Sequence, residues 1–197
     1  MMMDDAQVIV ITPPAAEPLT LAEAKTHLRV DLTDDDAYIT RLIQYAREQC
    51  EIGARRAFMP QTLELRLECW PVDGDIEFPM SPLVSVTSIK WTDWDGVEWT
   101  MPASDYVVYA TMDPGVLYLK PTAQWPIGQL QVGPSIAIRY IAGYASAAAV
   151  PASYKQAILL LVGHLYENRE AVVVGTTTSI LPMAVASLLN ADRVSWW

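Results

Sequence analysis

The stretch VPASYKQAILLLVGHLYENRE, Val150–Glu170, decides the fold of this chain. Pro151 suits the first turn of a helix, where its missing N–H costs nothing and its fixed φ is helical. Beyond it, apolar side chains recur at helical spacing along one face: Tyr154, Ile158, Leu161 and Leu165. The pattern predicts a helix with one buried stripe, which ends where Asn168, Arg169 and Glu170 return the chain to water.

A second apolar stripe lies on the flank of the same helix and consists of Leu159, Val162 and Tyr166. A helix that is apolar on most sides is buried on most sides, either by its own fold or by a neighbouring subunit. We therefore expect Leu159, Val162 and Tyr166 to form a subunit interface. The stretch contains no catalytic motif, so it indicates packing and assembly before chemistry.

Composition and charge narrow the class of protein. The chain has 197 residues, 52% of them hydrophobic, which predicts one globular domain or two small ones. No apolar run approaches the roughly 18 residues of a membrane span, and the acidic N-terminus does not resemble a signal peptide. The net charge of −10 argues against a protein that binds nucleic acid by neutralising phosphates. It suits a surface past which DNA moves without binding, although solubility alone would also explain it.

The residues that carry most enzyme chemistry are sparse. Only His27 and His164 supply an imidazole, and no cluster of His and Cys has the spacing of a zinc site. Nucleotide-binding and nucleophile-elbow motifs do not occur, so we expect no catalytic, cofactor or metal site. Cys50 falls in a predicted helix and Cys69 in a predicted strand. Both are expected to be buried thiols in a reducing cytoplasm, with a disulfide as the alternative.

The first third of the chain predicts an arm and two helices. Residues 1–18, with three prolines, are expected to form an extended arm, and a capping box of Thr20 and Glu23 starts the first helix. The acidic loop at residues 31–36 lacks the ligand spacing of a calcium loop, so Thr33 or Asp34 is expected to cap the second helix. That helix follows helical periodicity as far as Ala57. Charged residues are expected on its opposite, polar side: Arg41, Arg47, Glu48 and Glu51.

From residue 61 the period changes to two, which predicts strands. The expected strands cover residues 62–70, 75–79, 84–91, 97–101, 106–110, 116–120 and 135–144. Short strands separated by turn residues indicate a small antiparallel sandwich or barrel. The predicted fold class is therefore α+β. A helical bundle from both chain ends, residues 19–60 and 150–170, carries an antiparallel β-domain, residues 61–149, inserted between its second and third helices.

Residues 171–197 are expected to be a flexible linker and a short C-terminal helix. Its apolar side chains, followed by two terminal tryptophans, are the candidate docking residues: Leu181, Val185, Leu188, Leu189, Trp196 and Trp197. A helix this short is marginal alone in water, and tryptophan is favoured as an interface anchor. We expect the segment to be mobile in the free protein and ordered on docking. The alternative is that it folds back on its own bundle.

Several segments, in this order, carry a resemblance to a known family: LTLAEAKTHLRVD, DDDAYITRLIQYAREQCE, PQTLELRLECWP, WTDWDG, IRYIAGY and the stretch 150–170. From about Leu19 to Glu170 the chain resembles the head–tail connector (adaptor) proteins of long-tailed phages and phage-like gene transfer agents. The resemblance implies a non-enzymatic ring, expected to be a dodecamer, at the head–tail junction of a particle that is assembled in the host cytoplasm. It implies contacts with the portal protein and a stopper or tail-completion protein, and a channel through which DNA passes. The docking residues of the C-terminal segment would then contact the portal or an adjacent subunit.

Two other classes of function remain open at this stage. Trp91, Trp94 and Trp99 surround one predicted hairpin, which would suit a carbohydrate- or cell-surface-binding β-module with a helical oligomerisation stem. Cross-strand aromatic pairing within the sheet also explains them. A hydrolase whose site the sequence does not reveal is the third possibility.

Overall fold

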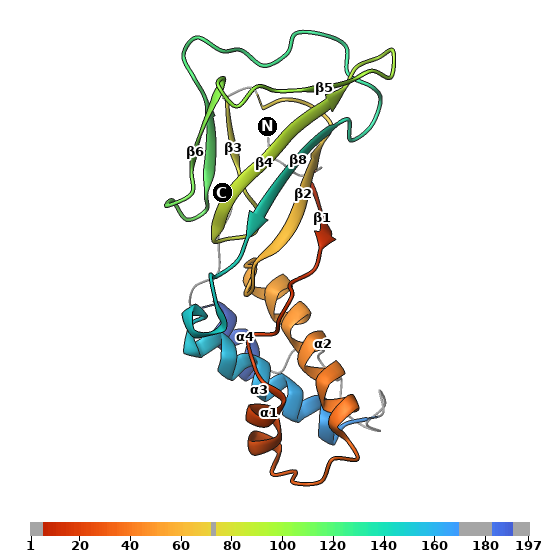
Figure 1. The fold of residues 1–197 in the computed structure, drawn as a ribbon, viewed down its shortest axis with the longest axis vertical. Helices are drawn as coiled ribbons and strands as arrows, with labels where there is room; N and C mark the ends of the chain where they lie inside the picture. Colours follow the sequence, from red (N-terminus) through yellow and green to blue (C-terminus); the bar gives the residue numbers. More distant parts are fainter. Residues whose placement is uncertain (1–5, 72–73, 170–182, 191–197) are drawn as a thin grey trace. The chain divides into compact units, whose positions relative to one another are not determined.

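The computed structural model describes residues 6–71, 74–169 and 183–190. The chain divides into two compact units. The β unit combines residues 1–15 with 60–143, and the helical unit combines residues 16–59 with 144–197. Helices and antiparallel sheets both occur, so the predicted α+β class is confirmed (Figure 1).

Helix α1, Leu21–Leu28, begins with the predicted capping box. The Thr20 hydroxyl accepts a bond from the Glu23 N–H, and the Glu23 carboxylate accepts one of 2.7 Å from the Thr20 N–H. Helix α2, Asp36–Ala54, has Asp35 as its N-cap, not Thr33 or Asp34. It also ends three residues before Ala57, because Arg55 adopts a left-handed conformation with φ 55°. In that conformation the backbone N–H groups at the helix end reach the carbonyls of Glu51 and Ile52.

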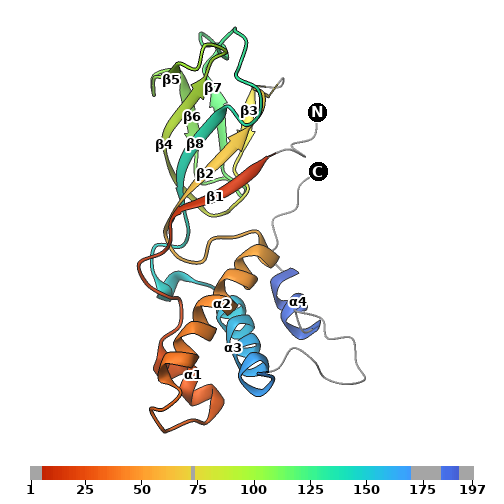
Figure 2. The same cartoon turned by 90° about the vertical axis from the view of Figure 1, so that its right-hand side faces the viewer.

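Helix α3, Ala152–Glu167, follows a short 3-10 turn at Ala147–Ala149, and helix α4 covers Met183–Asn190. Helices α2, α3 and α4 pack against one another, and α1 lies against α2 and α3 (Figure 2). The stripe predicted for α3 is in the core: Tyr154, Ile158 and Leu161 are buried, while Leu165 is partly buried. Phe58, just after α2, stacks on Tyr154 with ring centroids 4.7 Å apart.

The β unit contains two antiparallel sheets. The larger has the order β1-β2-β8-β4-β5 and the smaller the order β3-β7-β6. The strands are β1 Gln7–Thr12, β2 Gln61–Leu67, β3 Asp75–Glu77, β4 Leu83–Thr92, β5 Glu98–Thr100, β6 Tyr106–Tyr109, β7 Val116–Leu119 and β8 Ile136–Ala142. Strand β1 was not predicted: it lies in the stretch expected to be an arm and forms the edge of the larger sheet next to β2.

The core of the β unit lies between its two sheets. On the inner face of the larger sheet, Leu63 of β2 is in register with Tyr140 of β8, and both are buried. Phe78, which follows β3 of the smaller sheet, meets the Tyr140 ring at 4.8 Å. Glu64, one residue from Leu63, is on the opposite face, where Arg66 and Arg139 bond to its carboxylate at 3.0 and 2.9 Å. The side chains of β2 therefore alternate between faces as predicted, although Glu64, on the outer face, is buried as well.

Candidate functional site

The second stripe of α3 is only partly available to a neighbouring subunit. Leu159 and Tyr166 are partly buried, but Val162 is fully buried in the core of its own chain. Val162 lies four residues after Ile158, so the two side chains share a helix face and Val162 joins the core stripe. The prediction that Val162 belongs to a subunit interface is therefore wrong in this conformation.

Helix α2 exposes two apolar side chains that its main periodic stripe did not indicate, on a face that also carries Glu48. Tyr45 and Ile52 are seven residues apart, hence on the same side of the helix, and both are exposed, Ile52 by 67%. The only sequence signal was their position outside the main periodic stripe. Leu159 and Leu160 of α3 also keep part of their surface exposed. Both leucines also pack against the core of their own helical unit, so only the exposed part of each is available to a neighbouring subunit.

Tyr166 is engaged within its own chain. Its hydroxyl donates a hydrogen bond of 2.5 Å to Asp35, the N-cap of α2, and Arg169 donates one of 3.0 Å to the same carboxylate. The Arg169 guanidinium also lies over the rings of Tyr38 and Tyr166, at 4.8 and 5.1 Å. The bond from Tyr166, with help from Arg169, lowers the pKa of Asp35, and the same bond raises the pKa of Tyr166. This cluster holds the end of α3 against the start of α2.

Two residues expected on the polar side of α2 are buried instead. Arg47 bonds to Glu17 and to Glu51, each at 2.7 Å, and the other Glu51 oxygen accepts the Phe58 N–H at 2.6 Å. The neighbouring carboxylates raise the pKa of Arg47, although burial acts in the opposite direction. The prediction of solvent exposure was wrong for Arg47 and Glu51, because Glu17, far away in the sequence, completes a buried ion network.

The predicted docking residues of the C-terminal segment separate into two groups. Val185 and Leu189 of α4 are buried in the core of the helical unit, and Leu188 is partly buried against it. Val185 and Leu189 therefore provide no free docking surface in this conformation, which corresponds to the alternative in which α4 packs on its own bundle. Leu181, Trp196 and Trp197, and most of the segment expected to be mobile, lie outside the described residues.

Other predicted features can be located directly. Cys50 is buried, but Cys69 is exposed, because β2 ends at Leu67 and Cys69 follows it; the expectation of two buried thiols was wrong for Cys69. Within residues 6–71, 74–169 and 183–190, no group of His, Cys, Asp and Glu side chains could hold a metal ion. Among the described helices, none has the length and hydropathy required to cross a membrane.

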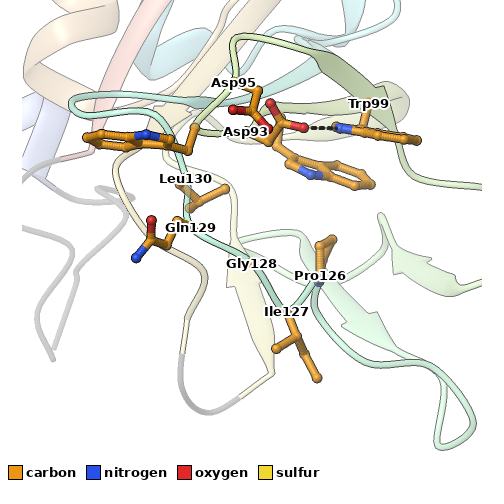
Figure 3. Close-up of a pocket in the computed structure, with 10 residues that line it drawn as sticks. Asp93, Asp95, Trp99, Pro126, Ile127, Gly128, Gln129 and Leu130 are labelled. Carbon is orange, nitrogen blue, oxygen red and sulfur yellow. Dashed lines mark hydrogen bonds between the residues drawn. The ribbon is translucent and has the colours of Figure 1, made fainter.

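The hairpin tryptophans line a pocket of the β unit with a volume of about 510 Å³. Trp91 and Trp99 are in register on β4 and β5, as the cross-strand pairing hypothesis requires, whereas Trp94 lies outside both strands. Figure 3 shows Trp99 and Pro126 on opposite sides of the pocket, with the Asp93 carboxylate hydrogen-bonded to Trp99 and the Asp95 side chain next to Asp93. Trp94 also lines the pocket and is exposed.

A second group of tryptophans stabilises this part of the β unit. Trp70 stacks on Trp125 with ring centroids 4.6 Å apart and meets the Trp91 ring edge-on at 5.9 Å. Trp91 thus belongs both to this aromatic cluster and to the wall of the pocket, which ties the pocket to packed side chains behind it.

Comparison with known proteins defines the class. Residues 18–112 match the phage gp6-like head-tail connector protein family. None of the curated proteins matches the chain. Three similar solved structures each cover 97% of this chain and 97% of the compared chain. They come from the neck of an empty gene transfer agent particle computed with C6 symmetry (25% identity, TM-score 0.78), the virion of a native gene transfer agent particle (24%, 0.75) and the neck of a native particle computed with C12 symmetry (22%, 0.74).

The resemblance to head–tail connectors of phages and gene transfer agents is therefore confirmed. The family match covers α1, α2 and strands β2 to β6, and the likeness to the neck chain extends over nearly the whole length. Both support a connector role for this chain.

Proposed function

We propose that this protein is a structural, non-enzymatic head–tail connector that forms a ring below the portal and leaves a channel for DNA. The connector family match and the likeness to a gene transfer agent neck chain support this function. A dodecamer is the expected stoichiometry, and a neck structure computed with C12 symmetry supports it. The ring would contact the portal protein on one side and a stopper or tail-completion protein on the other.

The geometric observation that carries the proposal is the exposed apolar surface on both α2 and α3 of the helical unit. A closed ring larger than a dimer is built from heterologous contacts, in which each subunit joins two different surfaces. Tyr45 and Ile52 of α2 provide one such surface, and the exposed parts of Leu159 and Leu160 of α3 provide another. We propose that the α2 face of one subunit packs on the α3 face of the next.

In this proposal the C-terminal segment still docks on the portal, but only some of the six predicted residues make that contact. Val185 and Leu189 anchor α4 to the bundle, with Leu188 beside them. Leu181, Trp196 and Trp197 then remain the proposed portal contacts, because large aromatic side chains act as interface anchors. The acidic chain would let DNA pass without being held.

The ring contact is tested with Ile52→Lys and a matched control, Leu32→Lys. Leu32 lies in the loop before α2 and is as exposed as Ile52, at 72% and 67%. Lysine is a good helix former, and at position 52 it would lie four residues after Glu48, so Ile52→Lys should not destabilise the protein. Leu32 is exposed in a loop, so Leu32→Lys should not destabilise it either. We expect cells that produce particles with Ile52→Lys to accumulate DNA-filled heads without tails, whereas Leu32→Lys gives normal particles.

Electron microscopy of the particles and the melting temperatures of both purified variants complete the experiment. Tailed particles at the normal frequency with a stably folded Ile52→Lys protein would show that the α2 face is not a ring contact. If Ile52→Lys particles lack tails yet still carry the connector in its normal copy number, the α2 face contacts another neck protein and the ring contact lies elsewhere.

A further inference from the structure

The pocket of the β unit lies between the β4–β5 hairpin and the loop at residues 126–130. Its walls combine indole rings with acidic and amide side chains: Trp94, Trp99, Pro126, Asp93, Asp95 and Gln129. The described residues that line it include no lysine or arginine. A half-open pocket with aromatic walls and carboxylates but no cation has the composition of a site for a positively charged group.

Hydrogen bonds hold the pocket in shape without a ligand. One Asp93 oxygen accepts the Trp99 indole N–H at 2.7 Å, and the other accepts the Val97 N–H at 2.9 Å. The loop is fastened to the hairpin at two points. The Trp94 N–H donates to the Gln129 carbonyl at 3.0 Å, and the Gln131 N–H donates to the Thr92 carbonyl at 3.1 Å. Binding would therefore require little rearrangement of the Trp99 ring or the loop.

The charge of the pocket is negative. The bonds from Trp99 and Val97 lower the pKa of Asp93, so its carboxylate is ionised at neutral pH. Glu98 is neutralised by Lys90 at 2.6 Å, which leaves Asp93 and Asp95 as the charges beside the indole rings. Carboxylates only accept hydrogen bonds, and a guanidinium only donates them. Sugar hydroxyl groups can also donate to carboxylates, so it is the negative charge of the pocket that favours a cation over a glycan.

The rim indicates a protein surface as the source of the cation. Ile127, which lines the pocket, is 93% exposed, and Trp94 and Trp99 are exposed beside it, so apolar surface accompanies the carboxylates. Tryptophan and arginine are both enriched among the residues that contribute most to binding at protein interfaces, so exposed indole rings beside carboxylates suit an arginine of a protein partner.

We propose that this pocket binds an arginine side chain of a protein partner, with its guanidinium against Trp94 and Trp99 and its charge opposite Asp93 and Asp95. Arginine fits better than lysine, because its planar group stacks on aromatic faces as well as pairing with carboxylates. The inference goes beyond the ring and concerns a different unit of the chain. Arginine binding is measured on the isolated protein, so its result does not depend on whether the protein acts as a connector.

The test is an NMR titration of the full-length protein that follows the indole N–H signals. The Trp99 signal is assigned by its loss in Trp99→Phe. The probe is the acetylated and amidated tripeptide alanine–arginine–alanine, and its matched control has citrulline, the neutral isostere of arginine. We expect a saturable shift of the Trp99 signal, with binding of the citrulline peptide at least about fivefold weaker.

Substitutions then show how much each side chain contributes to peptide binding. Asp95→Asn should weaken the arginine peptide about threefold or more, and Trp94→Ala should weaken both peptides. Asp75→Asn, on β3 and outside the pocket, should change nothing. Equal binding of the two peptides, or no saturable shift with either, overturns the proposal. A cello-oligosaccharide that saturates the Trp99 signal at lower concentration than the arginine peptide would also overturn it and make the pocket a glycan site.

Discussion

The hydroxyl of Tyr166 donates a 2.5 Å hydrogen bond to the Asp35 carboxylate and so joins the last turn of α3 to the N-cap of α2. The two residues are 131 positions apart in the sequence. The chain between the two helices connects the end of α2 to the start of α3. The bond joins the other two ends, the start of α2 and the end of α3. It also makes the junction sensitive to the protonation of Asp35.

The first prediction concerns the effect of pH on the stability of the helical unit. The Tyr166 bond lowers the pKa of folded Asp35, whereas in the unfolded chain the pKa stays near an ordinary value of about 4. A depressed pKa contributes stability that is present above the unfolded pKa and is lost as pH falls through the folded pKa. Tyr166→Phe should therefore lower the melting temperature at pH 6, and this difference from the wild type should shrink toward pH 3. Tyr45→Phe, at an exposed tyrosine of α2, is the control; a Tyr166→Phe deficit that does not depend on pH would contradict the assignment.

The second prediction concerns the buried ion network. Arg47→Met removes the guanidinium that bonds to both Glu17 and the buried Glu51, and breaking this network should destabilise the helical unit by about 3–5 kcal/mol. Arg41→Met, on the exposed side of the same helix, should change stability by no more than about 0.5 kcal/mol. Urea unfolding followed by circular dichroism at 222 nm measures both. Equal effects of the two substitutions would remove the structural role assigned to Arg47.

The third prediction concerns the two thiols. Cys50 is buried, and burial together with the charge of Glu51 raises its pKa to about 12, so it has almost no thiolate at pH 8. Cys69 is exposed. Iodoacetamide should therefore add one group to the native protein, at Cys69, and a second only after denaturation. Peptide mass spectrometry identifies the position, and rapid labelling of Cys50 in the native state would contradict its burial.

The fourth prediction concerns α4. Leu189 is 1% exposed in the core of the helical unit, so Leu189→Ala should destabilise that unit by about 2–4 kcal/mol. Met183, in the first turn of the same helix, is 89% exposed, and Met183→Ala should cost no more than about 0.5 kcal/mol. Chemical unfolding distinguishes the two. An unchanged stability for Leu189→Ala would favour the sequence-based hypothesis of an independent docking helix.

The fifth prediction concerns DNA. A chain with a net charge of −10 has no general means of neutralising phosphates, so the isolated protein should not bind duplex DNA measurably near 150 mM salt. Fluorescence anisotropy with a labelled duplex is the measurement. Tight binding that weakens steeply with salt would contradict the proposal that DNA passes through the ring without being held.

Local patterns predicted the individual elements because they depend on local physics. The 3.6-residue period of α2 and α3, the two-residue alternation of β2 and the capping box of Thr20 and Glu23 each arise from the geometry of a few neighbouring residues. Each expected strand from β2 to β8 is present, with ends that differ by a few residues. The order of these segments was also sufficient to indicate the connector family, which the comparisons then confirmed.

What the sequence could not determine is which distant segment covers each face. Periodicity placed Val162 on the flank of α3, but only the packed bundle buries it. Arg47 and Glu51 were expected in water and are buried because Glu17, thirty residues before Arg47, completes their network. Tertiary structure likewise fixed Val185 and Leu189 in the core, paired β1 with β2, and brought Pro126 opposite Trp99 to form the pocket. The sequence by itself determined which faces are apolar, because that is a property of neighbouring residues, and the tertiary structure decided their partners, because burial depends on contacts between residues far apart in the chain.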